Sequence, residues 1–267
     1  MEYHFAKELE GRSIVITGAG RGIGREMATA AAAAKMRVAI LEINRDDLDR
    51  TVAELQSLGG DVTGYQVDLG VESEVVDTLG SVEKDFGVID VLVNNAMFHD
   101  ASELLETSLE IWEKTLRINL TAPFLAIRTV LPGMIKRGSG CIINIGTVNA
   151  KVMVGSDAYS ASKGGVHVLT RTVAVRYGPE GIRCNTIVPG TVATPIWEEC
   201  LARNPQIFQD LKPWYPLGRV GKPSDIAAAV LFLASDQSEW VSGSEFVVDG
   251  GLLAGLAPMY RLAEGSD

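Results

Sequence analysis

The sequence predicts an α/β fold: a doubly wound parallel sheet of about seven strands with helices on both faces. Short apolar runs alternate with helix-length stretches along nearly the whole chain, which is the pattern of strand–helix–strand units. Most of these runs are apolar throughout rather than alternating, as expected of strands that are covered on both faces. Four glycines between Gly18 and Gly24 separate the first run from the first helix-length stretch, where the chain has to turn sharply.

The predicted elements follow one another in regular order. Strands are predicted at residues 13–17, 37–41, 62–67, 89–94, 141–145, 183–188 and 245–248. Helices are predicted at residues 22–34, 45–58, 72–86, 108–137, 157–177 and 224–234. The fourth helix begins with Thr107-Ser108-Leu109-Glu110, which supplies a capping box. Because no linker, repeat or low-complexity tract interrupts the alternation, we expect a single domain over residues 1–267.

The charge balance limits the classes of partner. The chain of 267 residues has a formal net charge of -10 and no cluster of arginine or lysine, whereas nucleic-acid binders carry a basic surface. Residues 1–8 lack the basic region and apolar stretch of a secretory signal. The apolar run 28–34 is far shorter than the roughly 20 residues of a membrane-spanning helix. We therefore expect a cytoplasmic protein with neither a nucleic-acid nor a membrane partner.

Neither the cysteines nor the histidines predict a metal site. The three cysteines are odd in number and show no C-x-x-C spacing, so reduced thiols are expected. The three histidines are far apart in the sequence and belong to no ligand motif. These residues are Cys141, Cys184, Cys200, His4, His99 and His167.

The glycine cluster predicts a loop that binds a dinucleotide phosphate. It does not match the strict G-x-G-x-x-G fingerprint, because Ile23 or Arg25 stands where the last glycine is required. It does match T-G-x-x-x-G-x-G, which begins at Thr17 and leaves Gly20 as an additional glycine. The pyrophosphate would meet the helix that starts near Gly22, where free N–H groups favour an anion. The alternative is a glycine-rich surface turn.

Glu42, at the end of the second predicted strand, favours NAD as the cofactor. It follows Gly24 by 18 residues, close to the spacing of the acidic residue that binds the adenosine ribose. A carboxylate there accepts hydrogen bonds from a 2′-hydroxyl and repels a 2′-phosphate. Two neighbours, Arg21 and Arg45, could neutralise such a phosphate, and an ordinary solvated strand end is the alternative for Glu42. We expect NAD in preference to NADP.

Tyr159 and Lys163 form the candidate catalytic pair. They are four residues apart in a predicted helix, which puts both on one face. The pKa of a phenol is near 10, too high for a base at neutral pH. A neighbouring ammonium group and a cationic nicotinamide ring both favour the phenolate. Spacing alone proves little, because such pairs are common on solvated helix faces.

Several motifs occur in order along the chain. They are TGAGRGIG at 17–24, VDL at 67–69, NNA at 94–96, Asn119 in RINLTAPF, YSASK at 159–163, Pro189-Gly190 with Thr194, and VDGG at 248–251. With these motifs at these intervals, residues 14–251 resemble the short-chain dehydrogenase/reductase family, in particular its main branch of roughly this chain length. The resemblance implies a Rossmann-like fold and a homotetramer with its contacts on the long helices near 108–137 and 157–177.

The resemblance also implies a role for each site residue. Tyr159 would be the general acid/base, Lys163 would lower its pKa and bind the nicotinamide ribose, and Asn119 would hold a water that relays protons. Asn94 would order the cofactor pocket. The implied cofactor-binding residues are Thr17, Gly18, Gly20, Arg21, Gly22, Ile23, Gly24, Glu42, Asp68 (near the adenine), Leu69, Asn95, Ala96, Tyr159, Lys163, Pro189, Gly190 and Thr194 (near the carboxamide).

Two positions depart from the family pattern. The strand-end motif that usually supplies a serine reads Ile145-Gly146-Thr147, so Thr147 would polarise the substrate oxygen. Threonine keeps the hydroxyl, although its methyl group restricts the rotamer. Thr147 precedes Tyr159 by twelve residues, one fewer than in many relatives, which leaves Gly146 at the more frequent spacing. Met97 stands where N-N-A-G normally ends in glycine, either as a pocket wall or as core packing.

The predicted function is that of an NAD-dependent oxidoreductase, which transfers a hydride between its cofactor and a secondary alcohol or ketone. A substrate lid is expected at about residues 190–220. Its aromatic residues indicate an apolar substrate surface, unless they pack on the lid itself or against a neighbouring subunit. They are Trp197, Phe208, Trp214 and Tyr215. Two alternatives remain: an NADPH-dependent 3-oxoacyl reductase, disfavoured by Glu42, and a non-catalytic dinucleotide-binding sensor or scaffold.

Overall fold

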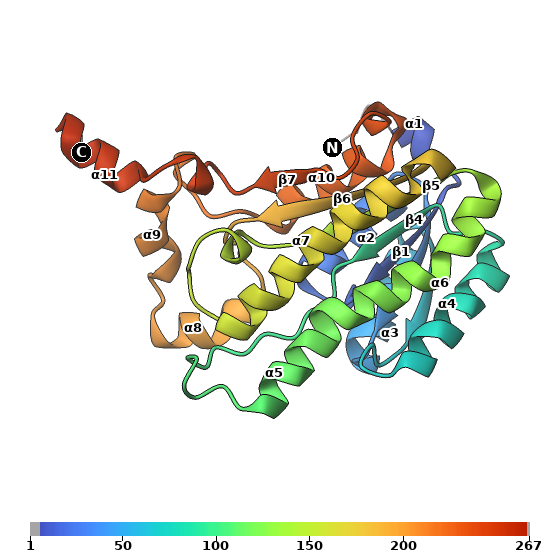
Figure 1. Ribbon diagram of the computed structural model, residues 1–267, viewed down its shortest axis with the longest axis horizontal. Coiled ribbons are helices and arrows are strands. Elements are labelled where there is room, and N and C mark those ends of the chain that lie inside the picture. Colours follow the sequence, from blue (N-terminus) through green and yellow to red (C-terminus); the bar gives the residue numbers. More distant parts are fainter. Residues whose placement is uncertain (1–5, 266–267) are drawn as a thin grey trace.

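The computed structural model describes residues 6–265 (Figure 1). Residues 1–5, which include His4 and most of the stretch considered for a secretory signal, lie outside the described residues. The strands are β1 (Ser13–Thr17), β2 (Arg37–Glu42), β3 (Asp61–Gln66), β4 (Val91–Asn94), β5 (Gly140–Ile145), β6 (Ile182–Pro189) and β7 (Glu245–Val248). They form one seven-stranded sheet in the order β3-β2-β1-β4-β5-β6-β7, and every neighbouring pair is parallel. The predicted fold class is confirmed.

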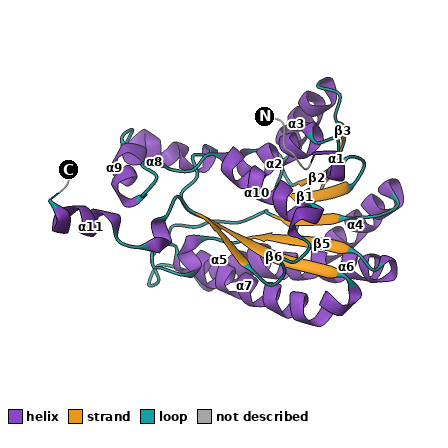
Figure 2. Ribbon diagram, turned by 90° about the horizontal axis from the view of Figure 1, so that it is seen from above, coloured by secondary structure: helices purple, strands orange, loops and turns teal. Residues whose placement is uncertain are grey.

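Helices cover both faces of this sheet (Figure 2). One layer contains α2 (Gly22–Ala33), α3 (Arg45–Ser57) and α10 (Pro223–Ala234), and the other contains α4 (Glu72–Phe86), α6 (Ala122–Arg137) and α7 (Asp157–Tyr177). Successive side chains of a strand point to opposite faces, so Ile14 and Ile16 enter the first core while Val15 enters the second. Burial on both faces explains why the central strands are apolar throughout.

The remaining helices are short or stand at the rim of the sheet. They are α1 (Ala6–Leu9), α5 (Leu109–Leu116), α8 (Glu198–Arg203), α9 (Ile207–Leu211) and α11 (Ala257–Glu264). Helices α8 and α9 lie within the segment expected to form the lid, beyond the carboxyl ends of the strands (Figure 1). The parallel order brings all seven carboxyl ends to that edge, and the direction of strand succession changes between β1 and β4. Ligands of doubly wound sheets bind at this switch point.

The predicted helix 108–137 is continuous but not uniform. A π-helical segment, Arg117–Thr121, joins α5 to α6. The predicted capping box is wrong by one residue, because Ser108 caps the helix by accepting a hydrogen bond from Ile111 N at 3.2 Å. The Thr107 hydroxyl instead donates backwards to Glu103 O. Residues 109–137 are apolar enough to cross a membrane by composition, yet half of the most apolar window is buried inside the protein, so this is a core helix.

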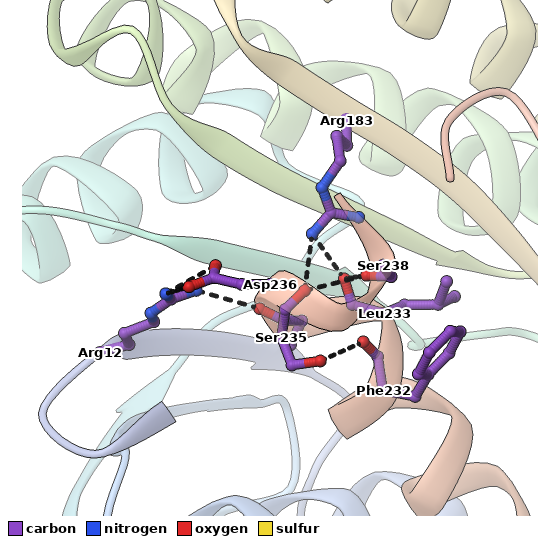
Figure 3. Close-up of polar contacts among 8 residues, drawn as sticks. Arg12, Arg183, Phe232, Leu233, Ser235, Asp236 and Ser238 are labelled. Atoms are coloured by element: carbon purple, nitrogen blue, oxygen red, sulfur yellow. Dashed lines mark hydrogen bonds and ion pairs between the residues drawn. The ribbon is translucent and has the colours of Figure 1, made fainter. Parts of the chain in front are cut away.

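The opposite edge of the sheet, at the amino ends of the strands, is held by arginines (Figure 3). Arg12 makes two hydrogen bonds of 2.7 Å with the carboxylate of Asp236. Arg183 donates to Leu233 O at 2.8 Å, near the carboxyl end of α10. The last carbonyl groups of a helix lack partners within the helix and carry partial negative charge. These guanidinium groups therefore stabilise the end of α10, far from the glycine loop.

Candidate active site

The glycine loop after β1 leaves a cradle for an anion. Gly18 has φ of +64°, which a side chain rarely adopts, and a Cβ there would lie 2.8 Å from Ala96 Cα. A Cβ at Gly24 would lie 2.2 Å from Gly18 O. Helix α2 then begins at Gly22 with Arg21 at its N-cap, and no side chain of residues 6–265 caps its free N–H groups. Exposed N–H groups at the start of a helix bind phosphate, so these residues fit the pyrophosphate of a dinucleotide.

Thr17 and Asn95 tie this loop to β4. The Thr17 hydroxyl accepts hydrogen bonds from Asn95 N at 2.9 Å and Ala96 N at 3.0 Å. The Asn95 amide donates to Thr17 O at 2.9 Å and Gly18 O at 3.0 Å. These hydrogen bonds join the ends of β1 and β4 at the switch point, through Thr17, Asn95 and Ala96. Ile23, the second residue of α2, packs against the core beneath the loop.

Glu42 faces the glycine loop. Its carboxylate accepts hydrogen bonds from Gly20 N at 3.0 Å, Ile43 N at 2.9 Å and Asn44 N at 3.1 Å. It is therefore a fixed charge beside the cradle rather than an ordinary solvated strand end. Arg45, considered above as a neutraliser of a 2′-phosphate, is bound to Asp49 at 2.7 Å.

Asp68 and Leu69 follow β3 at the same edge of the sheet. Asp68 Oδ1 accepts a hydrogen bond from Gly70 N at 2.8 Å, which shapes a turn. Glu74 accepts a hydrogen bond from Asp68 N at 2.8 Å. Leu69 packs partly buried against the core under α4 and α6. The turn presents the Asp68 backbone next to the end of β2, where Val67 N donates to Glu42 O.

The lid begins directly above the glycine loop. Pro189 ends β6, and Gly190 N donates to Val248 O at 3.1 Å. A Cβ at Gly190 would meet Asp249 Cα at 3.1 Å, so the strand end is tightly packed. A Cβ at Gly22 would lie 3.7 Å from Thr194 Cβ. The structure therefore brings Thr194 to the start of α2, at the rim of the anion cradle.

Lys163 is buried at the carboxyl end of β5. Its side chain is 2% exposed, and its Nζ donates to Ile145 O at 2.7 Å. Burial lowers the pKa of Lys163 to about 8. The Nζ atom lies 5.8 Å from the centroid of the Tyr159 ring, so both side chains do face one spot.

The environment of Tyr159 differs from the expectation. Burial raises the pKa of Tyr159 to about 12, and the nearby Thr147 hydroxyl acts in the opposite direction. The Lys163 ammonium group, which the resemblance implies would lower this pKa, donates to Ile145 O rather than to the phenol in the protein alone. Within the protein alone, desolvation outweighs the distant positive charge.

Thr147 is the residue that brings a hydroxyl to this spot. It follows β5, is 8% exposed, and accepts a hydrogen bond from Asn149 N at 3.2 Å. Gly146, at the more frequent family spacing, has no room for a side chain: a Cβ there would lie 2.5 Å from His167 Nε2 and 2.7 Å from Thr186 Cγ2. Packing beneath β5 therefore leaves Thr147 as the hydroxyl group beside Tyr159.

Asn119 lies in the π-helical segment and is fully buried. Its Oδ1 accepts from Phe98 N at 2.7 Å, and its Nδ2 donates to Phe98 O at 2.8 Å and to Ser162 Oγ at 3.2 Å. Ser162 Oγ donates in turn to Tyr159 O at 2.6 Å. The side-chain amide of Asn119, which was expected to hold a water, thus makes its hydrogen bonds to protein atoms instead.

Sequence reasoning missed two features of the site. Asn94 donates to Asn144 at 2.8 Å, and Asn144 donates to Thr170 at 2.8 Å, which forms a buried polar network from β4 to α7. His99 lies beside Tyr159, with ring centroids 5.4 Å apart. Its position shortly after the Asn94-Asn95-Ala96 motif was the only signal. In the described part of the chain, no group of three or more His, Cys, Asp or Glu side chains could hold a metal ion.

The lid aromatics mostly pack on the lid. Trp197 and Phe208 meet edge to face, with ring centroids 5.7 Å apart. Tyr215 is buried, and its hydroxyl accepts a hydrogen bond from Thr191 N at 3.0 Å. Trp214, by contrast, is 48% exposed. Met97, which lies outside the lid in the loop after β4, is 40% exposed. Packing within the lid therefore accounts for three of these four aromatic residues, while Met97 is not core packing.

Comparison with known proteins agrees with this geometry. The family model described as enoyl-(acyl carrier protein) reductase matches residues 18–253. A 3beta-hydroxysteroid dehydrogenase 1 of Eggerthella lenta is 36% identical over 262 residues, 97% of this chain and 99% of that protein. A galactitol 2-dehydrogenase (L-tagatose-forming) of Cereibacter sphaeroides is 34% identical over 254 residues, 94% of this chain and 98% of that protein. The crystal structure of an oxidoreductase of the short-chain dehydrogenase/reductase family from Burkholderia thailandensis has a TM-score of 0.89 at 38% identity, covering 96% of this chain and 98% of that one.

Proposed function

Since the chain belongs to the short-chain dehydrogenase/reductase family, we propose that it interconverts a secondary alcohol and its ketone with NAD rather than NADP. It is an oxidoreductase of CH–OH groups that uses NAD(P). The observation that carries the proposal is the convergence of Tyr159, Lys163 and Thr147 at the carboxyl end of β5. This spot lies at the same edge of the sheet as the anion cradle.

Each side chain has one task in the proposed reaction. During oxidation, the phenolate form of Tyr159, which a cationic nicotinamide ring would favour, takes the proton of the substrate hydroxyl, and during reduction the phenol returns a proton to the carbonyl oxygen. Thr147 donates a hydrogen bond to the same oxygen and so orients it. Lys163 would bind the nicotinamide ribose. It keeps its positive charge at neutral pH, because its pKa of about 8 lies above 7. A bound dinucleotide would supply the acceptor or donor of the carbinol carbon's hydride, which balances the two electrons.

Protons that pass between the active site and solvent need a route that does not use the Asn119 side chain. The amide is held by Phe98 and Ser162, so we assign the relay water to main-chain oxygens of the π-helical segment Arg117–Thr121. A π-bulge interrupts the regular i→i+4 ladder and is frequent at functional sites. Asn119 then serves as a positioning residue for the loop that follows β4.

Glu42 supports the preference for NAD. Its carboxylate is fixed by three backbone N–H groups beside Gly20, where a 2′-phosphate would add like charge. Arg45, which could have offset that charge, is already paired with Asp49. We expect the adenosine ribose to bind Glu42 through its hydroxyl groups.

We further propose a cytoplasmic homotetramer. Apolar side chains are exposed on the outer layer of helices: Phe124 of α6 is 43% exposed, and Val168 and Val175 of α7 are 54% and 81% exposed. Contact with another copy would cover them. All three cysteines are free, which suits a reducing compartment. Multi-angle light scattering checks the assembly, and a monomer at micromolar concentration would contradict it.

Initial rates test the proposal. Reduction of NAD and NADP is followed with a panel of secondary alcohols, sugars, hydroxy acids and hydroxysteroids, with Tyr159→Phe in parallel. We expect NAD-linked turnover that Tyr159→Phe abolishes while NADH still binds. Turnover of 3-oxoacyl thioesters with NADPH would instead support the reductase alternative. Dinucleotide binding without turnover in either direction would support a sensor or scaffold.

A further inference from the structure

His99 contacts the catalytic tyrosine, yet the proposed mechanism does not use it. Its ring meets the Tyr159 ring edge to face, with 5.4 Å between the ring centroids. Its Nε2 lies 2.8 Å from the Ser156 hydroxyl. The imidazole therefore joins the loop after β4 to the residue that precedes α7.

Both ends of this bridge are held in place. The preceding residue, Phe98, is fixed by two hydrogen bonds with Asn119, one donated by the Phe98 N–H and one accepted by the Phe98 carbonyl group. Ser156 has φ of +60°, a left-handed conformation that is unfavourable for a serine and that tends to occur at functional sites. Phe98 on one side and Ser156 on the other therefore hold His99 in a defined position beside Tyr159.

His99 offers one free hydrogen-bonding atom at this position. Desolvation lowers the pKa of His99 below its ordinary value, against the influence of Asp100, and so favours the neutral ring. A neutral imidazole has one donor and one acceptor nitrogen. Nε2 is used by Ser156, whereas no protein atom within residues 6–265 hydrogen-bonds Nδ1.

We propose that His99 is a specificity-determining residue, which hydrogen-bonds an oxygen on the carbon next to the reacting carbon and so selects vicinal diols and α-hydroxy ketones. The inference rests on the proposed function, because it takes the reacting oxygen to be at Tyr159. That oxygen lies about 2.7 Å from the tyrosine hydroxyl, and an oxygen on the neighbouring carbon lies roughly one further hydrogen-bond length away. The His99 imidazole packs edge to face on the Tyr159 ring, with 5.4 Å between the ring centroids, and so lies beside the place that this second oxygen would take.

The segment between Thr147 and Ser156 offers no free charge to a substrate, and its amide Asn149 is engaged by Thr147 and by Gly155 O. In the segment between Thr147 and Ser156, Val152, Met153 and Val154 are exposed and apolar. Lys151, the one cation of this segment, is bound to Glu245. A substrate carboxylate therefore finds no free positive charge in this segment, whereas a neutral hydroxyl or carbonyl oxygen finds His99.

Matched pairs of alcohols test the inference. The pairs are butane-2,3-diol with butan-2-ol, and cyclohexane-1,2-diol with cyclohexanol, each as separate stereoisomers with NAD. We expect the wild-type kcat/KM to favour the diol by about tenfold, the value of one good hydrogen bond. His99→Leu should lower this ratio about five- to tenfold, because kcat/KM falls for the diol by that factor more than for the mono-alcohol. His99→Gln, which keeps hydrogen-bonding groups, should restore most of the preference.

A second variant separates recognition from support of the tyrosine. Ser156→Gly relieves the backbone and removes the partner of Nε2, so the protein should fold normally while the diol preference falls. An equal loss on both members of a pair in His99→Leu would overturn the inference, because His99 would then only support Tyr159. Turnover of mono-alcohols that depends on Tyr159, without preference for diols, would also overturn it and leave the proposed function intact. Absence of any Tyr159-dependent turnover would overturn both.

Discussion

Asn119 holds the backbone of Phe98 at both of its polar atoms, accepting from the N–H at 2.7 Å and donating to the carbonyl at 2.8 Å. This arrangement imitates the pairing of two strands, although one partner is a side chain within a helix. It connects the π-helical segment to the loop that carries His99. The face of α7 that carries Tyr159 and the loop that carries His99 therefore share one buried amide.

Replacing this amide should affect activity as well as stability. Asn119→Ala leaves both backbone groups of Phe98 without partners, which costs about 1–3 kcal/mol in the free energy of unfolding. Asn185→Ala is the matched control, because buried Asn185 also bonds backbone atoms at 2.7 and 3.0 Å, at Val241 and Ser244. Urea denaturation should show similar losses in both variants, and only Asn119→Ala should lose kcat/KM. Equal activity losses would contradict the positioning role.

The Thr147 hydroxyl should set the pH at which oxidation begins. Because this hydroxyl lowers a phenol pKa that burial has raised to about 12, Thr147→Ala raises that pKa further. Less phenolate is then present at every pH, so the rising limb of kcat/KM for oxidation moves to higher pH. We expect a loss of about ten- to a hundredfold near pH 8. Thr147→Ser should keep the wild-type profile, and an unshifted profile in the alanine variant would rule out this role.

Lys163 should make the protein more stable as pH rises above 8. Its pKa is about 8 in the folded protein, against the ordinary lysine value of 10.5 that applies to the unfolded chain. Between these values the unfolded chain binds more protons, so the free energy of unfolding increases with pH, by about 3 kcal/mol at most. Lys163→Met should abolish that increase and be more stable than wild type by about 1–2 kcal/mol at pH 7. Urea denaturation at pH 7 and pH 10 measures both, and an unchanged slope in the variant refutes the assignment.

Two glycine-to-alanine substitutions should have opposite effects. A Cβ at Gly24 would lie 2.2 Å from Gly18 O, and overpacking against backbone costs about 1–3 kcal/mol or more. Gly80 is exposed within α4, and a Cβ there would meet no heavy atom of the described chain within 4 Å. Gly80→Ala should therefore stabilise the protein by about 0.5–1 kcal/mol. Thermal unfolding of both variants tests the tight packing of the cradle, which would be wrong if Gly24→Ala melted like wild type.

The sheet and its order of elements could be predicted because burial on both faces leaves a strong sequence pattern. Val15 and Ile16 enter different cores and are both apolar, so β1 reads as one apolar run. The site residues that belong to ordered motifs, such as Tyr159 and Thr194, could be placed by resemblance alone. Their positions follow from parallel strands that end at one edge.

Other features depend on contacts that no local pattern encodes. The segment Arg117–Thr121 has no π-helical signal, and its geometry accompanies the contact between Asn119 and Phe98. The pKa of Tyr159 depends on burial by distant parts of the chain. His99 reaches Tyr159 because two loops meet across the site. Each of these features is a property of tertiary packing rather than of neighbouring residues.

The ion pair between Arg12 and Asp236 bears on how long the folded protein survives. The two residues are 224 positions apart, so their contact closes a very large loop and forms late. Interactions that are absent from the transition state slow unfolding without speeding folding. Because this ion pair is exposed, it should slow forced unfolding and thermal inactivation only modestly, by at most about 1 kcal/mol in the unfolding barrier, and leave the rate at which a newly made chain folds unchanged.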